Sequence, residues 1–407
     1  MRILFVSHAA NRSGAPLVLL DLLRFIRRET QIEASILSAR RGPLESEFAL
    51  YAVPFPHARP FQTATLLGAA KRRVGEGELP RREQIERVIN SAIRIQRRFA
   101  QGAARSAPRF DLVYANSAAS GEAVRALEPV LRRGAKLVVH VHELAGALGQ
   151  SRVGWAFLRE RGASFIAASD AVRDELIRGQ GIAPESVKTI YEWTDFARLA
   201  TDREAARRDL HARIGAPENA VIVGGCGMME ARKGADWWIQ SAFHALAVEP
   251  NARKSPAPLH FVWLGGGGNA FARDVKRDAN SYGLEGRVHF LPPTDEPKTF
   301  FAGIDIFCLS SREDPFPLVA VEAAAQGVPL ACFQNAGGTP ELVGHDAGVV
   351  VPWGDTSAMG RALASLGRDE SFRAQLGRNA SLRARQWCDV EQQAPRVVEI
   401  LKRVVAR

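Results

Sequence analysis

The feature that most constrains the fold is a repeated alternation of short apolar segments with helix-like stretches. Helical patterns lie between several of the apolar segments, for example from Pro16 to Arg28 and from Ala171 to Gly179. Alternating strands and helices predict an α/β architecture, and two such series predict two doubly wound, Rossmann-like domains with ligand-binding loops at the carboxyl ends of the strands. The predicted strands span residues 2–7, 33–39, 111–117, 136–143, 164–169 and 187–193, then 221–227, 260–266, 287–293, 304–311, 329–335 and 347–352.

The chain length also favours two domains. A chain of 407 residues exceeds the size at which a single hydrophobic core keeps growing. The polar, arginine-rich stretch from Asp195 to Asn219 separates the two series and is predicted to be a linker. We therefore expect an N-terminal domain over 1–195, a C-terminal domain over 196–388 and a final helix over 389–407.

The net charge of +10 is concentrated in the first half of the chain. Residues 1–195 hold 29 Lys and Arg against 20 Asp and Glu, whereas residues 196–407 hold 25 against 24. Residues 59–109 alone hold 12 basic against 4 acidic side chains, and residues 82–105 have the spacing of an amphipathic basic helix. Such a face is either simply solvated or contacts an anionic partner, such as a phosphorylated or lipid-linked acceptor or a membrane surface. Nucleic acid is disfavoured, because the stretch lacks interleaved stacking aromatic residues.

Several features bear on the cellular compartment. No apolar run approaches the roughly 20 residues that a membrane span needs, and the start, MRILFVSHAA, is typical of a first buried strand rather than a signal peptide. The cysteines show neither paired nor metal-type spacing, as expected of reduced thiols. We expect a cytoplasmic protein, with peripheral contact at the inner face of a membrane left open. The four cysteines are Cys226, Cys308, Cys332 and Cys388.

The stretch SSREDPFPLVAVEAAAQGVPL, residues 310–330, predicts a buried helix that carries one acidic side chain. Glu322 stands among alanines and valines, where a carboxylate is costly unless hydrogen bonds or an opposite charge satisfy it. It lies about two turns into the predicted helix, and helical side chains point back toward the amino end. Glu322 therefore either pairs with a buried arginine or accepts hydrogen bonds from two vicinal hydroxyls of a ligand.

The start of the same helix predicts an anion site. Asp314 precedes Pro315, a favoured first helical residue, and is either only a helix cap or a cap that also touches a ligand. Anions bind at helix amino ends, because free N–H groups and the helix dipole attract them. An anion site beside a diol-binding carboxylate describes a nucleotide-sugar site. The proline positions leave as free backbone donors Phe316, Leu318 and Val319.

These motifs resemble those of family 4 (group 1) of the retaining GT-B glycosyltransferases. The hallmark of that family is an acid, seven residues and then a glutamate, in a context that stands here as SREDPFPLVAVEAAAQGVP. The segments NAGGTPELV (335–343) and AGVVVPWGD (347–355) match the family's continuation, and the match extends over nearly the whole chain. The chain departs from the pattern at Asp314, which replaces glutamate, at prolines that replace both glycines, and at Met228, which stands where the family has arginine.

The resemblance implies a GT-B fold, with two Rossmann-like domains facing a central cleft. The N-terminal domain would bind the acceptor, the C-terminal domain would bind the nucleotide-sugar, and the helix over 389–407 would cross back to the N-terminal domain. It also implies transfer with retention of anomeric configuration. No protein nucleophile is evident, so we expect front-face transfer, in which the leaving diphosphate accepts the proton of the incoming hydroxyl.

The resemblance also assigns roles to single residues. Lys233, in GCGMMEARKGADWW, matches the family's diphosphate lysine, and Arg232 beside it is a candidate replacement for the missing arginine. Glu322 would hold the ribose, and Asp314 a hydroxyl of the transferred sugar. The other candidates are Gly14 in the glycine loop, His142 against the transferred sugar, and Phe290 and Leu291 beside the base.

No metal or cofactor is expected, because no two aspartates in the sequence stand two residues apart. The metal-binding Asp-x-Asp of the other large glycosyltransferase fold is therefore absent. A zinc reading of His140 and His142, at the end of the strand that also holds Glu143, is an alternative, but the spacing matches no standard site and a third ligand is unnamed. Without a metal, Lys233, backbone donors and the helix dipole would balance the diphosphate charge.

The sequence thus predicts a glycosyltransferase that moves a sugar from a nucleotide-sugar to a glycan or lipid-linked acceptor. Surface polysaccharide or lipopolysaccharide synthesis is the expected setting, because the first half is basic and the family often works there. The alternatives are a sugar-nucleotide epimerase or hydrolase of the same fold and a non-catalytic sugar-nucleotide-binding partner. The sequence leaves open the base, the sugar, the acceptor and the oligomeric state.

Overall fold

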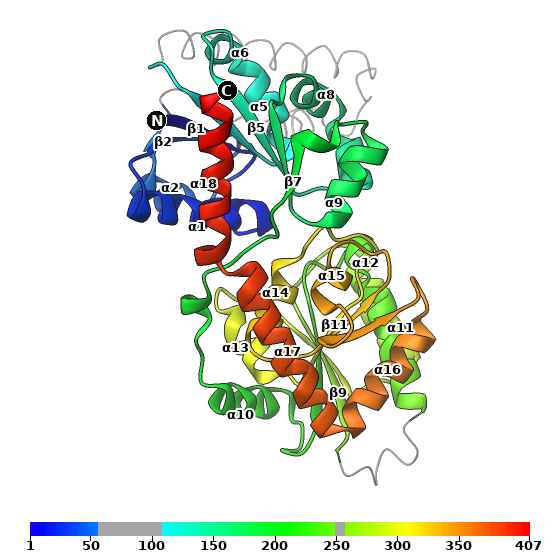
Figure 1. The fold of residues 1–407 in the computed structure, drawn as a ribbon. Helices are drawn as coiled ribbons and strands as arrows, with labels where there is room; N and C mark the ends of the chain where they lie inside the picture. The colour runs from blue at the N-terminus through cyan, green and yellow to red at the C-terminus, as the bar shows by residue number, and fades with distance from the viewer. Residues whose placement is uncertain (56–107, 249–256) are drawn as a thin grey trace, which may run out of the picture. The chain divides into compact units, whose positions relative to one another are not determined.

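The computed structural model describes residues 1–55, 108–248 and 257–407. The predicted basic helix over 82–105 lies outside these residues. Across the described chain, no helix is long and apolar enough to cross a membrane. Two compact units can be distinguished in Figure 1. Unit 1 comprises Met1–Ala167, Arg173–Ile190 and Ala394–Arg407, and unit 2 comprises Ala168–Val172 and Tyr191–Gln393.

Unit 1 is built on a parallel sheet in which the described strands follow the order β3-β2-β1-β4-β5-β6-β7 (Figure 1). The strand order reverses between β1 and β4, which are neighbours in the sheet. The chain leaves β1 toward β2 on one side and leaves β4 toward β5 on the other, so the loops after β1 and β4 diverge at the carboxyl edge. Strand β4 is buried along its whole length, as expected of a central parallel strand that is covered on both faces. The strands are β1 Arg2–Ser7, β2 Glu33–Ser38, β3 Val53–Pro54, β4 Leu112–Asn116, β5 Lys136–Val141, β6 Ser164–Ala167 and β7 Val187–Thr189.

The helices in this part of the chain connect the strands in sequence order. The helix that begins at Asp170 continues as a π-helical turn over Glu175–Gly179. The final helix α18 carries the chain end, and its residues from Ala394 onward belong to unit 1. The helices are α1 Gly14–Glu29, α2 Glu45–Tyr51, α5 Gly121–Ala126, α6 Glu128–Leu131, α7 Ala145–Leu148, α8 Arg152–Arg161, α9 Asp170–Asp174 and α18 Val390–Ala406.

Unit 2 repeats the doubly wound pattern with a second parallel sheet, whose described strands follow the order β10-β9-β8-β11-β12-β13. The order reverses between β8 and β11, which pair through Val223 and Ile306. The strands are β8 Val221–Cys226, β9 Leu259–Leu264, β10 Val288–Leu291, β11 Ile306–Leu309, β12 Leu330–Phe333 and β13 Gly348–Val351. The helices are α10 Arg203–Ile214, α11 Ala235–Ala247, α12 Ala270–Ser281, α13 Pro297–Gly303, α14 Leu318–Ala325, α15 Thr339–Val343, α16 Thr356–Arg368 and α17 Glu370–Cys388.

The core of unit 2 has two layers, one on each face of the sheet. Trp238 of α11 packs in one layer against Phe261 and Trp263 of β9, with ring centroids 5.7 and 5.5 Å apart. Phe301 of α13 packs in the other layer against Phe307 of β11, at 5.7 Å. Because both faces are covered, the strands are continuous apolar runs, which is why they could be recognised in the sequence.

The two parallel sheets confirm the predicted α/β fold. All twelve predicted strands are present, although several are shorter than predicted. Strand β3 was missed: it has two exposed residues, one of them Pro54, and therefore lacks any apolar pattern.

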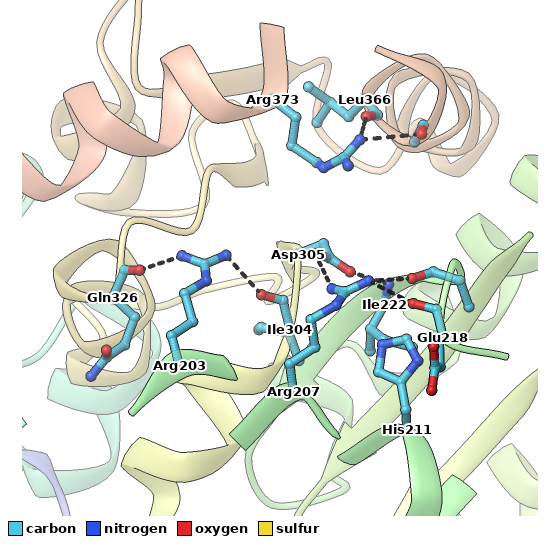
Figure 2. A network of polar contacts seen from close by, with 12 residues as sticks. Arg203, Arg207, His211, Glu218, Ile222, Ile304, Asp305, Gln326, Leu366 and Arg373 are labelled. Atoms are coloured by element: carbon cyan, nitrogen blue, oxygen red, sulfur yellow. Dashed lines mark hydrogen bonds and ion pairs between the residues drawn. The ribbon is translucent and has the colours of Figure 1, made fainter. Parts of the chain in front are cut away.

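The prediction that residues 195–219 form a linker was wrong. Helix α10 spans Arg203–Ile214, and the polar contacts in Figure 2 tie it to the amino ends of the central strands. Arg207 forms an ion pair with Asp305 and donates a hydrogen bond to the carbonyl of Ala220 at 2.8 Å. Asp305 in turn accepts from the amide of Ile222 at 2.8 Å. Arg203 and Arg207, two of the arginines that suggested a linker, therefore tie α10 to the rest of unit 2.

Candidate active site

Two loops meet at the point where the strand order of unit 2 reverses. One follows β8 and contains the 3₁₀ turn Ala231–Lys233, and the other follows β11 over residues 310–317. Gly234 allows their close approach: its φ is +67°, and a Cβ atom there would lie 2.0 Å from the carbonyl oxygen of Ser310. Only glycine tolerates both that backbone conformation and that distance. Loops at this position of a doubly wound sheet are where ligands bind.

Lys233 and Asp314 form a largely buried ion pair across these loops. The Nζ atom of Lys233 lies 2.6 Å from Oδ2 of Asp314, and the two side chains are 17% and 7% exposed. The hydroxyl of Ser311 donates to the same carboxylate oxygen at 3.0 Å. Charge-assisted hydrogen bonds of this length are strong and fix the orientation of both groups. The structure therefore brings together the two residues that the sequence placed on the diphosphate and on the transferred sugar.

A third loop, after β12, holds the backbone of Asp314 from the other side. The amide of Asp314 donates to the carbonyl of Ala336 at 2.6 Å, and the amide of Gly338 donates to Pro315 at 2.9 Å. Gly337 has φ +132°, and a Cβ atom there would lie 1.8 Å from the carbonyl oxygen of Asp314. The glycines of NAGGTPELV are thus required by a backbone contact with the acidic residue.

This arrangement corrects the predicted start of the helix. Helix α14 begins at Leu318, with Pro317 as its cap residue, so Asp314 is not the helix cap and Pro315 is not the first helical residue. Phe316 precedes the helix with its side chain 2% exposed, and its ring packs 5.1 Å from that of Tyr191. The expected amide donors at the helix start therefore reduce to those of Leu318 and Val319, which precede Ala320, the first amide that donates to Pro317.

Glu322 is the fifth residue of α14, just over one turn from its start rather than two. Its side chain is half-buried. Glu322 also acts electrostatically on Cys226, the last residue of β8. Burial and then the negative charge of Glu322 raise the pKa of the Cys226 thiol to about 12, while Lys233 acts in the opposite direction. Glu322 and Lys233 therefore both lie close to the carboxyl end of β8.

Arg232 forms a second, longer ion pair with the carboxylate of Asp314, whereas Met228 carries no charge. The Nη1 atom of Arg232 lies 3.9 Å from Oδ1 of Asp314 and donates to the carbonyl of Glu313 at 3.1 Å. Its Nη2 atom donates to Glu230 at 3.2 Å, and the side chain is 42% exposed. Met228 is 58% exposed. A cation is thus present beside Lys233, although the family's arginine position holds methionine.

Phe290 and Leu291 end strand β10, the outermost strand on the β9 side of the sheet. Both are half-buried, and the ammonium of Lys276 lies 5.5 Å from the centre of the Phe290 ring. Because every strand of the sheet is parallel, they lie at the same carboxyl edge as Lys233 and Asp314.

The carboxyl edge of the unit 1 sheet carries a separate polar cluster around His142. The Nε2 atom of His142 lies 3.2 Å from Oδ1 of Asn116, and the side-chain amide of Asn116 donates to the carbonyl of Ala15 at 2.9 Å. Because that second bond fixes the amide orientation, Nε2 of His142 is the donor, and in the neutral ring Nδ1 is the acceptor. Gly14, the predicted loop glycine, is exposed and begins α1.

Glu143 is the anchor of this cluster. Its carboxylate accepts hydrogen bonds from the hydroxyl of Ser117, from the amide of Ala118 at 3.1 Å and from the amide of His142 at 2.9 Å. Glu143 therefore orients the turn that carries His142. Within the described residues, no three His, Cys, Asp or Glu side chains are arranged to hold a metal ion, so the zinc alternative finds no third ligand there.

His8 belongs to the same cluster and was missed in the sequence. Burial lowers its pKa, Glu143 raises it, and His142 and Arg40 lower it further. Its Nδ1 atom is buried without a hydrogen-bond partner among the described residues. The signal was a polar residue at or directly after the carboxyl end of a buried strand, which also applies to Asn116 and Ser117.

Comparisons with known proteins bear on the family and the fold. The family model described as "Glycosyltransferase Family 4" matches residues 12–198, and that described as "Glycosyl transferases group 1" matches residues 206–383. A D-inositol 3-phosphate glycosyltransferase of Saccharomonospora viridis is 28% identical over 225 residues, 54% of this chain and 51% of that protein. The lipopolysaccharide core biosynthesis glycosyltransferase LpsE of Rhizobium meliloti is 31% identical over 192 residues, 47% of this chain and 50% of that protein. The chain spans about half the length of the curated relatives that it matches.

Solved structures show the same fold. The Anabaena protein HepE, in complex with UDP and glucose, superposes with a TM-score of 0.75 at 21% identity, over 99% of both chains. The sucrose-phosphate synthase of Thermosynechococcus elongatus superposes with a TM-score of 0.73 at 17% identity, over 100% of this chain and 99% of that one. With the two family models matching nearly the whole sequence on a GT-B fold, the chain belongs to glycosyltransferase family 4 (group 1).

Proposed function

We propose that this protein transfers a sugar from a nucleoside diphosphate sugar to a glycan or lipid-linked acceptor, with retention and without a metal ion. The observation that carries the proposal is the buried pair of Lys233 and Asp314, beside Arg232. Glu322 and Lys233 both act on the nearby Cys226 thiol. Cationic and acidic groups at one strand edge suit a ligand that has both phosphates and sugar hydroxyls.

The two ends of the donor make different demands on the site. The diphosphate carries negative charge, which Lys233, Arg232 and the first amides of α14 would balance. The sugar rings carry hydroxyls, which a carboxylate can accept: Glu322 for the ribose and Asp314 for the transferred sugar. An ammonium that already pairs with Asp314 still has two hydrogens for phosphate oxygens.

Catalysis would then depend on stabilising the leaving diphosphate. As the bond between the sugar and the diphosphate breaks, negative charge develops on the leaving oxygen, and the ammonium of Lys233 stabilises it. The incoming hydroxyl gives its proton to that oxygen and bonds to the same face of the sugar, so the configuration is retained. His142 keeps the role implied by the family, contact with the transferred sugar. Residues 1–195 are assigned to the acceptor and 196–388 to the donor.

The setting that we propose is surface polysaccharide synthesis, with the protein in the cytoplasm or peripheral on the inner face of the membrane. The matched lipopolysaccharide core glycosyltransferase and the basic first half of the chain support this setting. They are compatible with a lipid-linked acceptor.

The test is a donor screen followed by product analysis. UDP-, GDP- and ADP-sugars are incubated with the protein in EDTA, with and without a bacterial lipid-linked oligosaccharide fraction, and nucleotide release is measured. The proposal predicts release that depends on the acceptor, with the α-anomeric donor giving an α-linked product. Equal release without acceptor would indicate a hydrolase, and conversion of the donor to an epimeric sugar-nucleotide without acceptor would indicate an epimerase. Binding with neither release nor conversion would indicate a non-catalytic partner.

A further inference from the structure

Arg312 lies two residues before Asp314 and is bound to the opposite loop. Its Nη1 atom donates to the carbonyl of Ala231 at 2.5 Å and to Oδ1 of Asp236 at 2.8 Å. Its Nη2 atom donates to Oδ2 of the same aspartate at 2.6 Å. A bidentate arginine–carboxylate pair of this kind fixes geometry as well as contributing energy.

Two aromatic residues hold Arg312, one at its guanidinium and one at its backbone carbonyl. Its Cζ atom lies 3.9 Å from the ring centre of Trp237, the residue after Asp236. The indole N–H of Trp353 donates to the carbonyl of Arg312 at 3.2 Å, and the rings of Trp353 and Trp237 are 5.0 Å apart. Stacking on an aromatic face further restricts the arginine, so its position is set by α11.

Hydrogen bonds to backbone carbonyls extend this restraint to the ion pair. The amide of Arg312 donates to the carbonyl of Arg232 at 2.8 Å, and the guanidinium of Arg232 donates to the carbonyl of Glu313 at 3.1 Å. The hydroxyl of Ser310 donates to the carbonyl of Lys233 at 3.3 Å. The residues that flank Lys233 are thus joined to those that flank Asp314.

We propose that Arg312 is a positioning residue, which holds the 3₁₀ turn Ala231–Lys233 against α11 so that the ammonium of Lys233 stays aimed at a nucleoside diphosphate. Ordering the backbone of a loose turn during binding costs free energy. A turn fixed by Arg312 lowers that cost before the ligand arrives. The inference rests on the proposed function, because it takes the diphosphate as the ligand of Lys233.

The experiment compares diphosphate with monophosphate binding. UDP, GDP and ADP, each beside its monophosphate, are titrated calorimetrically into wild type, Arg312→Lys, Asp236→Asn and Lys233→Ala. Arg312→Lys keeps the charge but loses the bidentate pair. We expect Arg312→Lys and Asp236→Asn to bind the diphosphate roughly tenfold more weakly, which is the usual effect of losing one hydrogen bond to a charged group. Their affinity for the monophosphate should stay within about twofold of wild type.

A matched control separates positioning from general loosening. Arg207 forms a comparable partly buried pair with Asp305, at the amino ends of the strands (Figure 2). Arg207→Lys should lower the melting temperature about as much as Arg312→Lys does, because each loses a partly buried ion pair, but it should leave the diphosphate and monophosphate affinities unchanged. If Lys233→Ala loses diphosphate affinity while Arg312→Lys and Asp236→Asn do not, or lose both affinities equally, the positioning role is wrong and the proposed function stands. If Lys233→Ala binds diphosphate normally, or wild type binds no diphosphate, the proposed function fails and the positioning role falls with it.

Discussion

The α-carbon of Gly337 faces the carbonyl oxygen of Asp314 so closely that a Cβ atom there would lie 1.8 Å from that oxygen. Because the φ of Gly337 is +132°, a side chain would also strain the backbone. Gly337→Ala should therefore push the loop that carries Asp314 out of place. We expect a destabilisation of about 2–4 kcal/mol, measured by urea denaturation, and a loss of transfer activity.

Gly283 provides the control for this prediction. It also has a positive φ, +68°, but apart from its two chain neighbours no described residue has an atom within 4 Å of the position that a Cβ atom would take there. Gly283→Ala should cost only about 1 kcal/mol and leave activity unchanged. Equal activity in the two variants would show that the contact between Gly337 and Asp314 does not matter for transfer.

Glu322 is predicted to bind the ribose hydroxyls of the donor. Glu322→Ala should weaken binding of UDP, GDP or ADP by roughly 10- to 100-fold, because hydrogen bonds to a charged group are lost. The 2′,3′-dideoxy form of the same nucleotide lacks both hydroxyls, so its affinity should hardly differ between wild type and variant. If Glu322→Ala weakened both nucleotides equally, the carboxylate would not be binding the ribose.

The fold was predictable because buried strands are continuous apolar runs in the sequence. The details of the site depend on contacts between segments that are far apart in the sequence. Lys233, Asp314 and Glu322 could be selected from residue type and family spacing. The start of α14 could not: Pro315 predicts a helix start, but Asp314 is held in an extended bridge to Gly337, 23 positions along the chain. Helix α10 was missed because its exposed arginines and acids leave little apolar pattern, and its contact with Asp305 lies about 100 residues away.

The role of His142 can be tested by removing its ring and, separately, by removing the side chain of Asn116, which contacts that ring. His142→Ala should lower transfer turnover by roughly 100-fold, the usual weight of one well-placed catalytic group, without changing nucleotide affinity. Asn116→Ala should lower turnover less, because the ring remains but loses the partner of Nε2. His345 in unit 2 lies outside the His142 cluster, so His345→Ala serves as the control. Full activity of His142→Ala would remove the assignment.

The stability of unit 2 should fall in mild acid because of a histidine pair. His260 and His289 stack with Nδ1 of the first 3.2 Å from Nε2 of the second. Burial, then Arg287, lowers the pKa of His260 to about 4, and burial lowers the pKa of His289. In the unfolded chain these rings take up a proton near pH 6.5. The unfolded state therefore binds more protons between about pH 6.5 and pH 4, and the free energy of unfolding falls as the pH drops through that range.

His260→Phe tests whether the histidine pair causes the acid sensitivity, because the variant lacks one of the two rings that take up a proton on unfolding. Urea denaturation at pH 7.5 and at pH 5 should show a smaller acid loss in His260→Phe than in wild type, and an unchanged loss in His345→Ala. An identical loss in His260→Phe and wild type would mean that the pair does not set the acid sensitivity.

The most direct test of the account is nucleotide binding to Lys233→Ala in the presence of EDTA. Wild type should bind at least one of UDP, GDP and ADP without a metal ion, and Lys233→Ala should bind it roughly 10- to 100-fold more weakly, the weight of one or two charged hydrogen bonds to phosphate. Equal affinity of wild type and Lys233→Ala, or binding by wild type only when a divalent cation is added, would contradict the account.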